Sequence, residues 1–379
     1  MQTTGYRICN RCIMDTSHRE ITFDENGNCS HCSKAMELAP ITWFPGEAGE
    51  KMLHELADKI RKDQKGRDYD CIIGLSGGVD SSYLTYLTKV KLGLRPLVVH
   101  VDCGWNSELA VKNIENITRH LNIELHTFVV NWEEMKDLQR AFFKASVMDM
   151  DIPQDHAIFA ALYRFAEKNR IKYALNGHNY TTEIILPTSW GHQAMDLRHM
   201  QAIHDRFGEK KLKEFPTISF FRRFVYYSLI RDIRIISPLN YLNYRKEDAI
   251  DVMSRELGWQ YYGGKHHESR FTKFFQEYYL PHKFGFSKKR AHLSSLVISG
   301  QMTREEALHI MNEKEYTGSA INDDLEYVAK KLDWTPEEFR AVIDQPPRSH
   351  SEFASDDWMF KLGISAKRRL RKIVQKISG

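Results

Sequence analysis

The chain has 379 residues, more than one ordinary hydrophobic core contains, which suggests two or more structural units. Its 42% hydrophobic and 27% charged residues are typical of a globular protein, and no apolar run is long enough to span a membrane. A formal net charge of +4 is too weak to indicate nucleic-acid binding by the whole chain. Because the N-terminal residues also lack the apolar segment of a signal peptide, we expect a cytoplasmic protein.

The first feature along the chain is a cysteine pattern. Two Cys-x-x-Cys pairs, with sixteen residues between them, have the spacing of a tetrahedral zinc site, whereas disulfides are disfavoured in a reducing cytoplasm. Between the pairs, residues 21–23 predict a short strand and Asn26-Gly27 predicts a turn. We therefore expect residues 1–45 to form a zinc-ribbon module with structural Zn²⁺, and His18 and His31 are nearby alternative ligands. The expected ligands are Cys9, Cys12, Cys29 and Cys32.

Strands and helices then alternate. The pattern predicts a helix over 51–62, strand 71–75, helix 81–92, strand 96–102, helix 107–121, strand 123–130, helix 133–146, a helix from Pro153 to about Asn169, and strand 172–176. A late strand over 233–238 precedes a helix that begins near Arg245. This alternation predicts an α/β fold, a doubly wound and mostly parallel sheet with helices on both faces. We expect this unit to cover residues 46–245.

The turn after the first of these strands carries the most informative motif, Ser-Gly-Gly-Val-Asp-Ser-Ser at residues 76–82. Two glycines at a helix N-terminus let free backbone N–H groups approach a phosphate. A carboxylate at Asp80 fits such a loop if a hard cation accompanies the ligand, which suggests Mg²⁺. The loop lacks the endings of the Walker and dinucleotide-binding motifs. The expected phosphate-binding residues are Ser76, Gly77, Gly78, Asp80, Ser81 and Ser82.

Two other segments are expected at the same edge of the sheet, because ligands of such sheets bind at the carboxyl ends of the strands. His100 and Asp102 end the strand over 96–102, and Gly177 and His178 follow the strand over 172–176. Asp102 could hold Mg²⁺ or a ribose, or serve only the turn. His178 could contact a phosphate, move a proton or cap a helix. The two remaining cysteines, Cys71 and Cys103, are expected to be buried and inert.

A second polar motif lies at residues 261–275, where two glycines precede several cations and a carboxylate. It predicts an anion-binding loop that enters a helix; the alternative is a solvated polar loop. The chain beyond is expected to be helical, with capping boxes at 303–306 and 335–338, so residues 246–379 form a substrate or partner region. Basic residues over 361–376 predict a solvated helix face or, as the alternative, a contact with an acidic partner or membrane surface.

The loop at 76–82 matches the SGG-x-DS signature of the PP-loop ATP pyrophosphatases. The resemblance implies cleavage of ATP between its α- and β-phosphates, adenylation of a substrate oxygen, and displacement of AMP by a nucleophile. The segments 9–16, 21–32, 263–270 and 280–286 resemble, more narrowly, the N-acetyl sugar amidotransferases of bacterial surface-polysaccharide biosynthesis. These motifs extend from residue 9 to about residue 300.

This resemblance implies an ATP-dependent carbon–nitrogen ligase that forms AMP and pyrophosphate. Its reaction would convert an acetamido group of a nucleotide-activated N-acetyl sugar into an acetamidino group, in lipopolysaccharide O-antigen or related surface-glycan biosynthesis. The implied cofactors are ATP, Mg²⁺ and structural Zn²⁺. The implied catalytic residues are Asp80, Lys265, His266 and Glu268, and the implied substrate-binding residues are Lys265, His267 and Arg270. Their individual roles are left open.

No cysteine lies in a glutaminase context, so ammonia must come from elsewhere. The family resemblance implies a separate glutaminase subunit similar to that of histidine biosynthesis, with a companion cyclase-like subunit. One alternative function is a tRNA thiolase with an N-terminal zinc module, although the modest charge predicts no nucleic-acid partner. Another is a non-catalytic nucleotide-binding scaffold for the glutaminase.

Overall fold

The computed structural model describes residues 5–265, 267–313, 316 and 318–363. The predicted α/β fold is confirmed, because five described strands form one parallel sheet in the order β3-β2-β1-β4-β5. The strands are β1 (Cys71–Gly74), β2 (Pro96–Asp102), β3 (Leu125–Val129), β4 (Tyr173–Leu175) and β5 (Arg234–Ile236). The strand order reverses at β1, so the crevice between the ends of β1 and β4 is where such a sheet binds its ligand.

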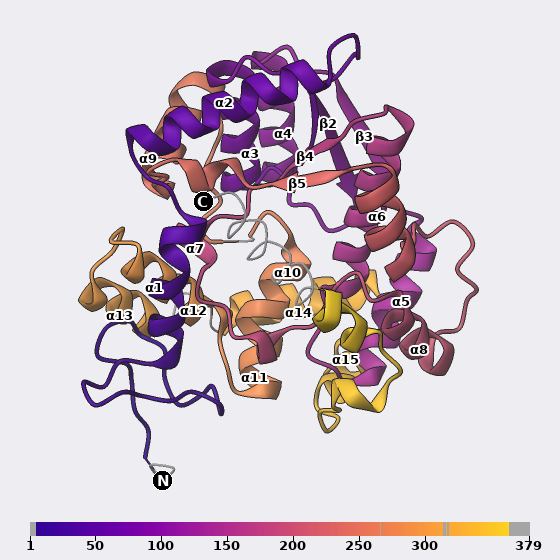
Figure 1. Cartoon of the computed structure of the whole chain (residues 1–379). Helices are drawn as coiled ribbons and strands as arrows, with labels where there is room; N and C mark the ends of the chain where they lie inside the picture. The colour runs from indigo at the N-terminus through magenta and orange to yellow at the C-terminus, as the bar shows by residue number, and fades with distance from the viewer. Residues whose placement is uncertain (1–4, 266, 314–315, 317, 364–379) are drawn as a thin grey trace.

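Helices cover both faces of the sheet (Figure 1). Side chains alternate along a strand, so Ile73 of β1 packs with one layer of helices and Ile72 packs with the other. The first layer contains α2 (Glu47–Asp63), α3 (Val79–Tyr86), α4 (Glu108–His120) and α9 (Lys246–Leu257). The second contains α5 (Trp132–Ala145) and α6 (Ile152–Lys168), with α8 (Leu197–Phe207) against α5.

Some elements differ from the predicted ones. The helix predicted over 81–92 is α-helical only as far as Tyr86, and Leu87–Lys91 continues it as a π-helix. A helix that was not predicted, α1 (Ser30–Thr42), begins directly at the second cysteine pair. Domain boundaries remain predictions, but α9 lies beyond the predicted boundary at residue 245 and packs in the same core as α3.

The predicted helical C-terminal region is confirmed for the described residues. Both predicted capping boxes are present, at Thr303–Glu306 and Thr335–Glu338. The helices are α10 (Arg270–Phe274), α11 (Leu280–Phe284), α12 (Lys288–Ile298), α13 (Arg304–Asn312), α14 (Ser319–Lys331) and α15 (Pro336–Ile343). Shorter elements are α7 (Tyr180–Glu183), the π-helices Arg222–Ile230 and Phe275–Tyr279, and the 3-10 helices Thr188–Trp190, Pro238–Tyr241 and His350–Glu352.

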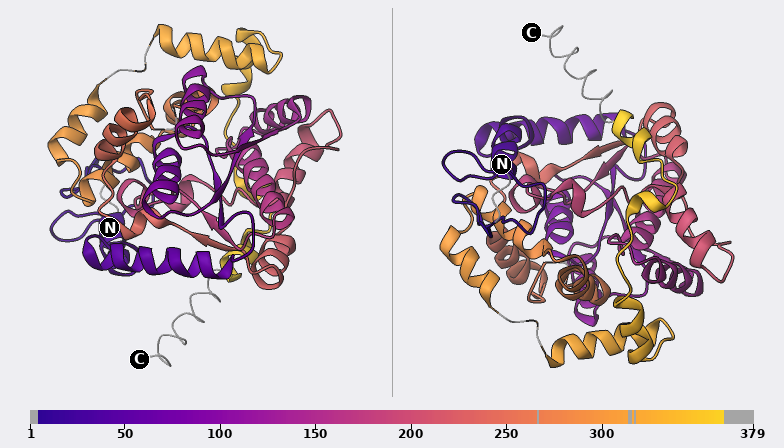
Figure 2. Two further views of the ribbon diagram at one scale, coloured as in Figure 1. Left: turned by 90° about the horizontal axis from the view of Figure 1, so that it is seen from above. Right: turned by 90° about the horizontal axis from the view of Figure 1, so that it is seen from below.

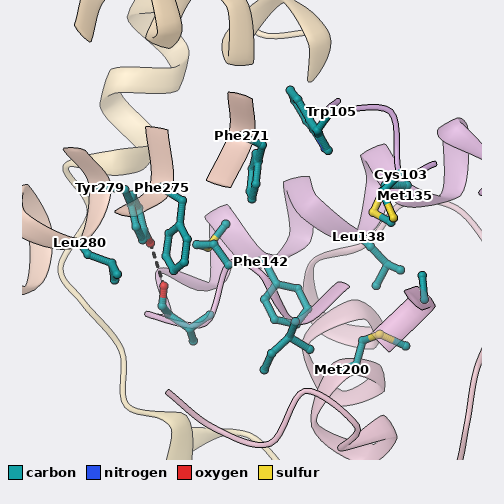
Figure 3. Packing of buried hydrophobic residues seen from close by; sticks show 14 of the residues in the cluster. Cys103, Trp105, Met135, Leu138, Phe142, Met200, Phe271, Phe275, Tyr279 and Leu280 are labelled. Atoms are coloured by element: carbon teal, nitrogen blue, oxygen red, sulfur yellow. Dashed lines mark hydrogen bonds between the residues drawn. The ribbon is translucent and has the colours of Figure 1, made fainter. Parts of the chain in front are cut away.

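The C-terminal helices share a hydrophobic core with the sheet unit. Phe271 and Phe275 lie near Phe142 of α5 and Met200 of α8 in one buried cluster (Figure 3). In the same cluster the Tyr279 hydroxyl donates a hydrogen bond of 2.9 Å to the main-chain oxygen of Val147. Helices α14 and α15 lie on the opposite side of the molecule from α2 (Figure 2). The region is therefore anchored to the sheet unit over a wide apolar contact.

The cysteine-rich segment packs on α12 and α13, which lie beside α1 in Figure 1. Ile13 is buried against Leu293 and Ala307, and the Arg304 guanidinium donates to the main-chain oxygens of Cys9 and Cys12. The basic residues predicted to form a C-terminal helix face lie mostly outside the described residues. Among the helices that the structure describes, none is both long and apolar enough to cross a lipid bilayer.

Candidate active site

The glycine-rich turn after β1 has the strained geometry of a close-packed loop. Gly77 has a φ of +82°, and a Cβ atom there would lie 2.6 Å from the main-chain oxygen of Ala110 on α4. A Cβ at Gly78 would lie 2.8 Å from the Glu268 carboxylate. Both positions therefore require glycine, and the backbone of the turn is held between α4 and the loop that carries Glu268.

The serines of the turn hold its shape and face a cavity. The Ser76 and Ser81 hydroxyls lie 3.1 Å apart, and the Gly78 N–H donates to the Ser76 hydroxyl at 3.2 Å. The adjoining cavity has a volume of about 170 Å³ and is bordered by Ser76, Gly78, Asp80 and Ser81. Ser82 is completely buried and does not border it. The open N–H groups, hydroxyls and tight glycines fit the phosphates of ATP.

A lysine and two carboxylates form the charged centre of this cavity. The Lys265 ammonium lies 2.8 Å from a Glu183 oxygen and 3.9 Å from an Asp80 oxygen, and it donates to the Thr182 hydroxyl at 3.1 Å. Burial alone would lower the pKa of Lys265, but Glu183 and Asp80 raise it overall. The ammonium therefore stays charged beside the phosphate loop.

The two carboxylates differ in their surroundings. Burial raises the pKa of Asp80, whose other oxygen accepts a 2.6 Å hydrogen bond from the Tyr244 hydroxyl. Burial would raise the pKa of Glu183 as well, but Lys265 and His178 hold it well below its usual range. These carboxylates, together with phosphate oxygens, fit the ligand preference of Mg²⁺. Sequence reasoning missed Glu183 and Tyr244, because neither lies in a recognisable motif.

The second polar motif crosses directly over the phosphate loop. The Val79 N–H donates to the Tyr262 hydroxyl at 3.0 Å, and the Trp259 ring N–H donates to the main-chain oxygen of Gly77 at 3.1 Å. The main-chain oxygen of Glu268 accepts a 2.8 Å bond from the Ser107 N–H after β2. The structure therefore brings this distant segment, including Lys265 and Glu268, to the switch point of the sheet.

A larger cavity of about 300 Å³ adjoins the first. Thr182, Lys246 and Lys265 border both cavities, and His267 borders the larger one. The His267 ring lies 3.4 Å from a Glu277 carboxylate oxygen. Two ligands could therefore lie side by side with Lys265 between them.

The other predicted site residues lie at varying distances from these cavities. Gly177 borders the smaller cavity, where a Cβ would lie 3.0 Å from the backbone of Asp80. His178 pairs with Glu183, which raises the pKa of its imidazole. Arg270 borders neither cavity, because its guanidinium pairs with Asp324 at 2.5 Å and lies over the Tyr327 ring. His266 lies outside the described residues.

His100 and Asp102 are tied into the turn that follows β2. His100 Nδ1 lies 2.9 Å from the Leu75 oxygen, and the Asn106 amide lies 3.0 Å from His100 Nε2. Asp102 accepts from the Gly104 N–H and from the Asn106 amide. Neither residue borders the cavities, so their predicted nucleotide contacts stay predictions.

The four N-terminal cysteines converge as the spacing predicts. All four are buried, and their sulfur atoms lie within 4.8 Å of one another, with separations of 3.6–3.7 Å for three pairs. A tetrahedral zinc site with Zn–S bonds near 2.3 Å has edges of about 3.8 Å. The arrangement therefore fits Zn²⁺. The alternative ligands His18 and His31 instead bond to each other at 3.1 Å.

Comparisons with known proteins divide the chain into two matched parts. Residues 268–367 match the C-terminal domain model of WbpG-like lipopolysaccharide biosynthesis proteins, and residues 50–216 match the NAD synthase model. An uncharacterized protein of Methanocaldococcus jannaschii is 24% identical over 79% of this chain and 91% of its own length. A glutamine-hydrolyzing GMP synthase from Archaeoglobus fulgidus, matched through one of its subunits, is 30% identical over 35% of this chain and 41% of that protein.

Two solved structures are also similar in part. The NH3-dependent NAD synthetase of Campylobacter jejuni is 17% identical, with a TM-score of 0.29, over 42% of this chain and 72% of that chain. The NMN synthetase of Francisella tularensis is 16% identical, with a TM-score of 0.27, over 62% and 93% of the two chains. From the two matched family models and the parallel sheet with its phosphate loop, the chain belongs to the WbpG-like family of lipopolysaccharide biosynthesis within the ATP-utilising PP-loop superfamily.

Proposed function

We propose that this protein is an ATP-dependent amidotransferase that converts the acetamido group of a nucleotide-activated N-acetyl sugar into an acetamidino group. The observation that carries the proposal is the position of Lys265, which borders both the phosphate-loop cavity and the larger cavity beside it. ATP would occupy the first cavity and the sugar nucleotide the second. The amide would then lie next to the α-phosphate, and holding two reactants together lowers the entropic part of the barrier.

The chemistry requires activation of an amide, because resonance makes its carbonyl carbon a poor electrophile. The amide oxygen attacks the α-phosphorus of ATP, a P–O bond forms, and pyrophosphate leaves. Ammonia then adds to the carbon of the imidate adenylate, loses a proton, and AMP departs with the former amide oxygen. Lys265 is placed to stabilise the negative charge that develops on the phosphates. Mg²⁺ held by Asp80 and Glu183 would neutralise the triphosphate.

The ammonia would come from a separate glutaminase subunit, with a companion cyclase-like subunit. All six cysteines are buried, and burial raises the pKa of the Cys71 and Cys103 thiols, so neither is poised as a nucleophile. The same property counts against a thiolase, which would need reactive cysteines in the ATP-binding unit. A relative of this chain is named as a glutamine-hydrolyzing GMP synthase, which supports glutamine as the nitrogen source in such proteins.

The test combines the purified chain with ATP, Mg²⁺, an ammonium salt and a panel of UDP- and CMP-activated N-acetyl sugars. We expect AMP release with one sugar nucleotide, together with a product in which NH replaces one oxygen, identified by mass spectrometry. Glutamine should replace ammonium only when the glutaminase is added. AMP release with tRNA and a sulfur donor, in the absence of any sugar, would contradict the proposal. Product formation from glutamine by the chain alone would contradict the partner.

A further inference from the structure

A second group of metal-binding side chains lies outside both cavities and outside the cysteine cluster. Asp149 lies in the loop between α5 and α6, His192 in the loop before α8, His199 in the first turn of α8, and His350 near the end of the described chain. Ligand atoms of Asp149, His199 and His350 all lie within 4.8 Å of one another. Three segments that are far apart in the sequence therefore place potential ligands around one point.

The three imidazole rings form a stack. The ring centroid of His350 lies 3.5 Å from that of His192 and 3.7 Å from that of His199. Neighbouring imidazolium charges would repel each other at these distances, so the stack favours neutral rings, the form that binds metal ions. His192 holds the Asp149 carboxylate through its ring nitrogen at 2.7 Å and its main-chain N–H at 2.9 Å. Such a contact orients a carboxylate ligand.

His199 lacks the hydrogen bonds that a buried imidazole requires. It is completely buried, yet neither ring nitrogen has a hydrogen-bond partner among the described residues. Its ring packs edge-on against Phe142 and Phe353, which cannot supply one. Burying polar atoms without partners is unfavourable, and buried groups of this kind usually have a bound water or ion.

The spacing of the other two ligands also fits an ion between them. His350 Nδ1 lies 3.7 Å from an Asp149 carboxylate oxygen, which is too far for a hydrogen bond. Ligand atoms about 2.0 Å from a tetrahedral zinc ion lie about 3.3 Å from each other, close to this separation. The side chains of Asp149 and His350 are only 3% and 11% exposed. The surroundings are therefore those of an internal site.

We propose that Asp149, His199 and His350 bind Zn²⁺ in a second metal site, with His192 as the residue that positions the carboxylate. Two imidazoles and a carboxylate are ordinary zinc ligands, whereas Mg²⁺ and Ca²⁺ prefer oxygen ligands alone. The ion would join the segment at 349–353 to α8 and to the loop after α5. It would thereby fasten the WbpG-like C-terminal domain to the ATP-binding unit, independently of the proposed reaction.

The first test is the zinc content of the untagged full chain and its variants, measured by mass spectrometry with inductively coupled plasma. His199→Gln and His350→Gln should each contain one zinc equivalent less than the wild-type chain. His309→Gln is the matched control, because the His309 side chain is 78% exposed and outside the group. Equal zinc content in all four proteins would overturn the proposal, because any metal would then belong to the cysteines or be adventitious.

A second measurement needs no variant, in case the substitutions prevent folding. A mercurial reagent that reacts with thiols should release the cysteine-bound zinc from the wild-type chain and leave one equivalent bound. X-ray absorption at the zinc edge of the remaining metal should show nitrogen and oxygen neighbours and no sulfur. Release of all zinc by the mercurial, or a sulfur shell on what remains, would overturn the proposal.

Discussion

Substitution of Gly77 by alanine tests the phosphate loop most directly, and Gly66 provides a matched control. Both glycines have positive φ values, +82° and +78°, but a Cβ at Gly66 would meet no atom within 4 Å. Gly66→Ala should therefore cost only the left-handed backbone strain of an alanine, about 1–2 kcal/mol. Any larger effect at Gly77 must come from its surroundings.

The surroundings of Gly77 allow an estimate of that larger effect. The new Cβ would lie 2.6 Å from the Ala110 oxygen, whereas ordinary contact begins at 3.4 Å, so the two must separate by about 0.8 Å. The obstacle is backbone of α4, which cannot rotate away, and overpacking of this kind costs about 1–3 kcal/mol. We expect Gly77→Ala to lose about 2–5 kcal/mol of unfolding free energy in total.

Urea unfolding of the two variants and the wild-type chain would measure these losses, and calorimetric titration would measure ATP binding. A displaced loop should weaken ATP binding by about tenfold or more in Gly77→Ala, equivalent to about 1.4 kcal/mol, and leave Gly66→Ala unchanged. Equal unfolding free energies for the two variants, or unchanged ATP affinity in Gly77→Ala, would refute the proposed close packing of the loop against α4.

Three further predictions concern charges and metal. Lys265→Met should lower the rate of AMP formation about 100- to 1,000-fold, and adding Glu183→Gln should recover stability in urea but not the rate, since the rate depends on the ammonium itself; exposed Lys62→Met is the control, and recovery of both would make Lys265 only structural. His178 has a pKa raised by Glu183, so its stabilising contribution is complete below the unfolded value near 6.5 and is lost as the pH rises through the folded value. The stability difference between wild type and His178→Gln should accordingly shrink from pH 6 to pH 9, and a constant difference would contradict the pairing. Removal of cysteine-bound zinc with a thiol reagent should lower the melting temperature and expose the segment before α1 to proteases, and unchanged digestion would argue against a structural metal there.

Much of the fold could be predicted because its signals are local. The strand over 96–102 was predicted with its observed bounds, and the helix over 133–146 within one residue, from apolar runs and helical periodicity. The π-helical end of α3 was not predicted, because its apolar pattern differs little from that of an α-helix over five residues. The start of α1 was hidden by the cysteine pair, whose metal-ligand spacing dominates that stretch of sequence.

The site was predictable only in part, for a related reason. Ser76 and Asp80 lie in one short motif, and Lys265 lies in another, so each could be identified by itself. Glu183 and Tyr244 stand in segments without a motif, yet they contact Lys265 and Asp80 directly. Arg270 was expected to bind substrate from its neighbours in the sequence, but the turn into α10 directs it to Asp324.

The sequence by itself determined the alternating strands and helices, the phosphate loop and the four cysteine ligands, because each depends on residues within about thirty positions of one another. Only the tertiary structure decided which charges surround Lys265, that two cavities meet there, and that Asp149, His199 and His350 converge. These groupings join residues from separate segments of the chain. Their proximity follows from how the helices pack on the sheet and on each other, which no short sequence pattern encodes.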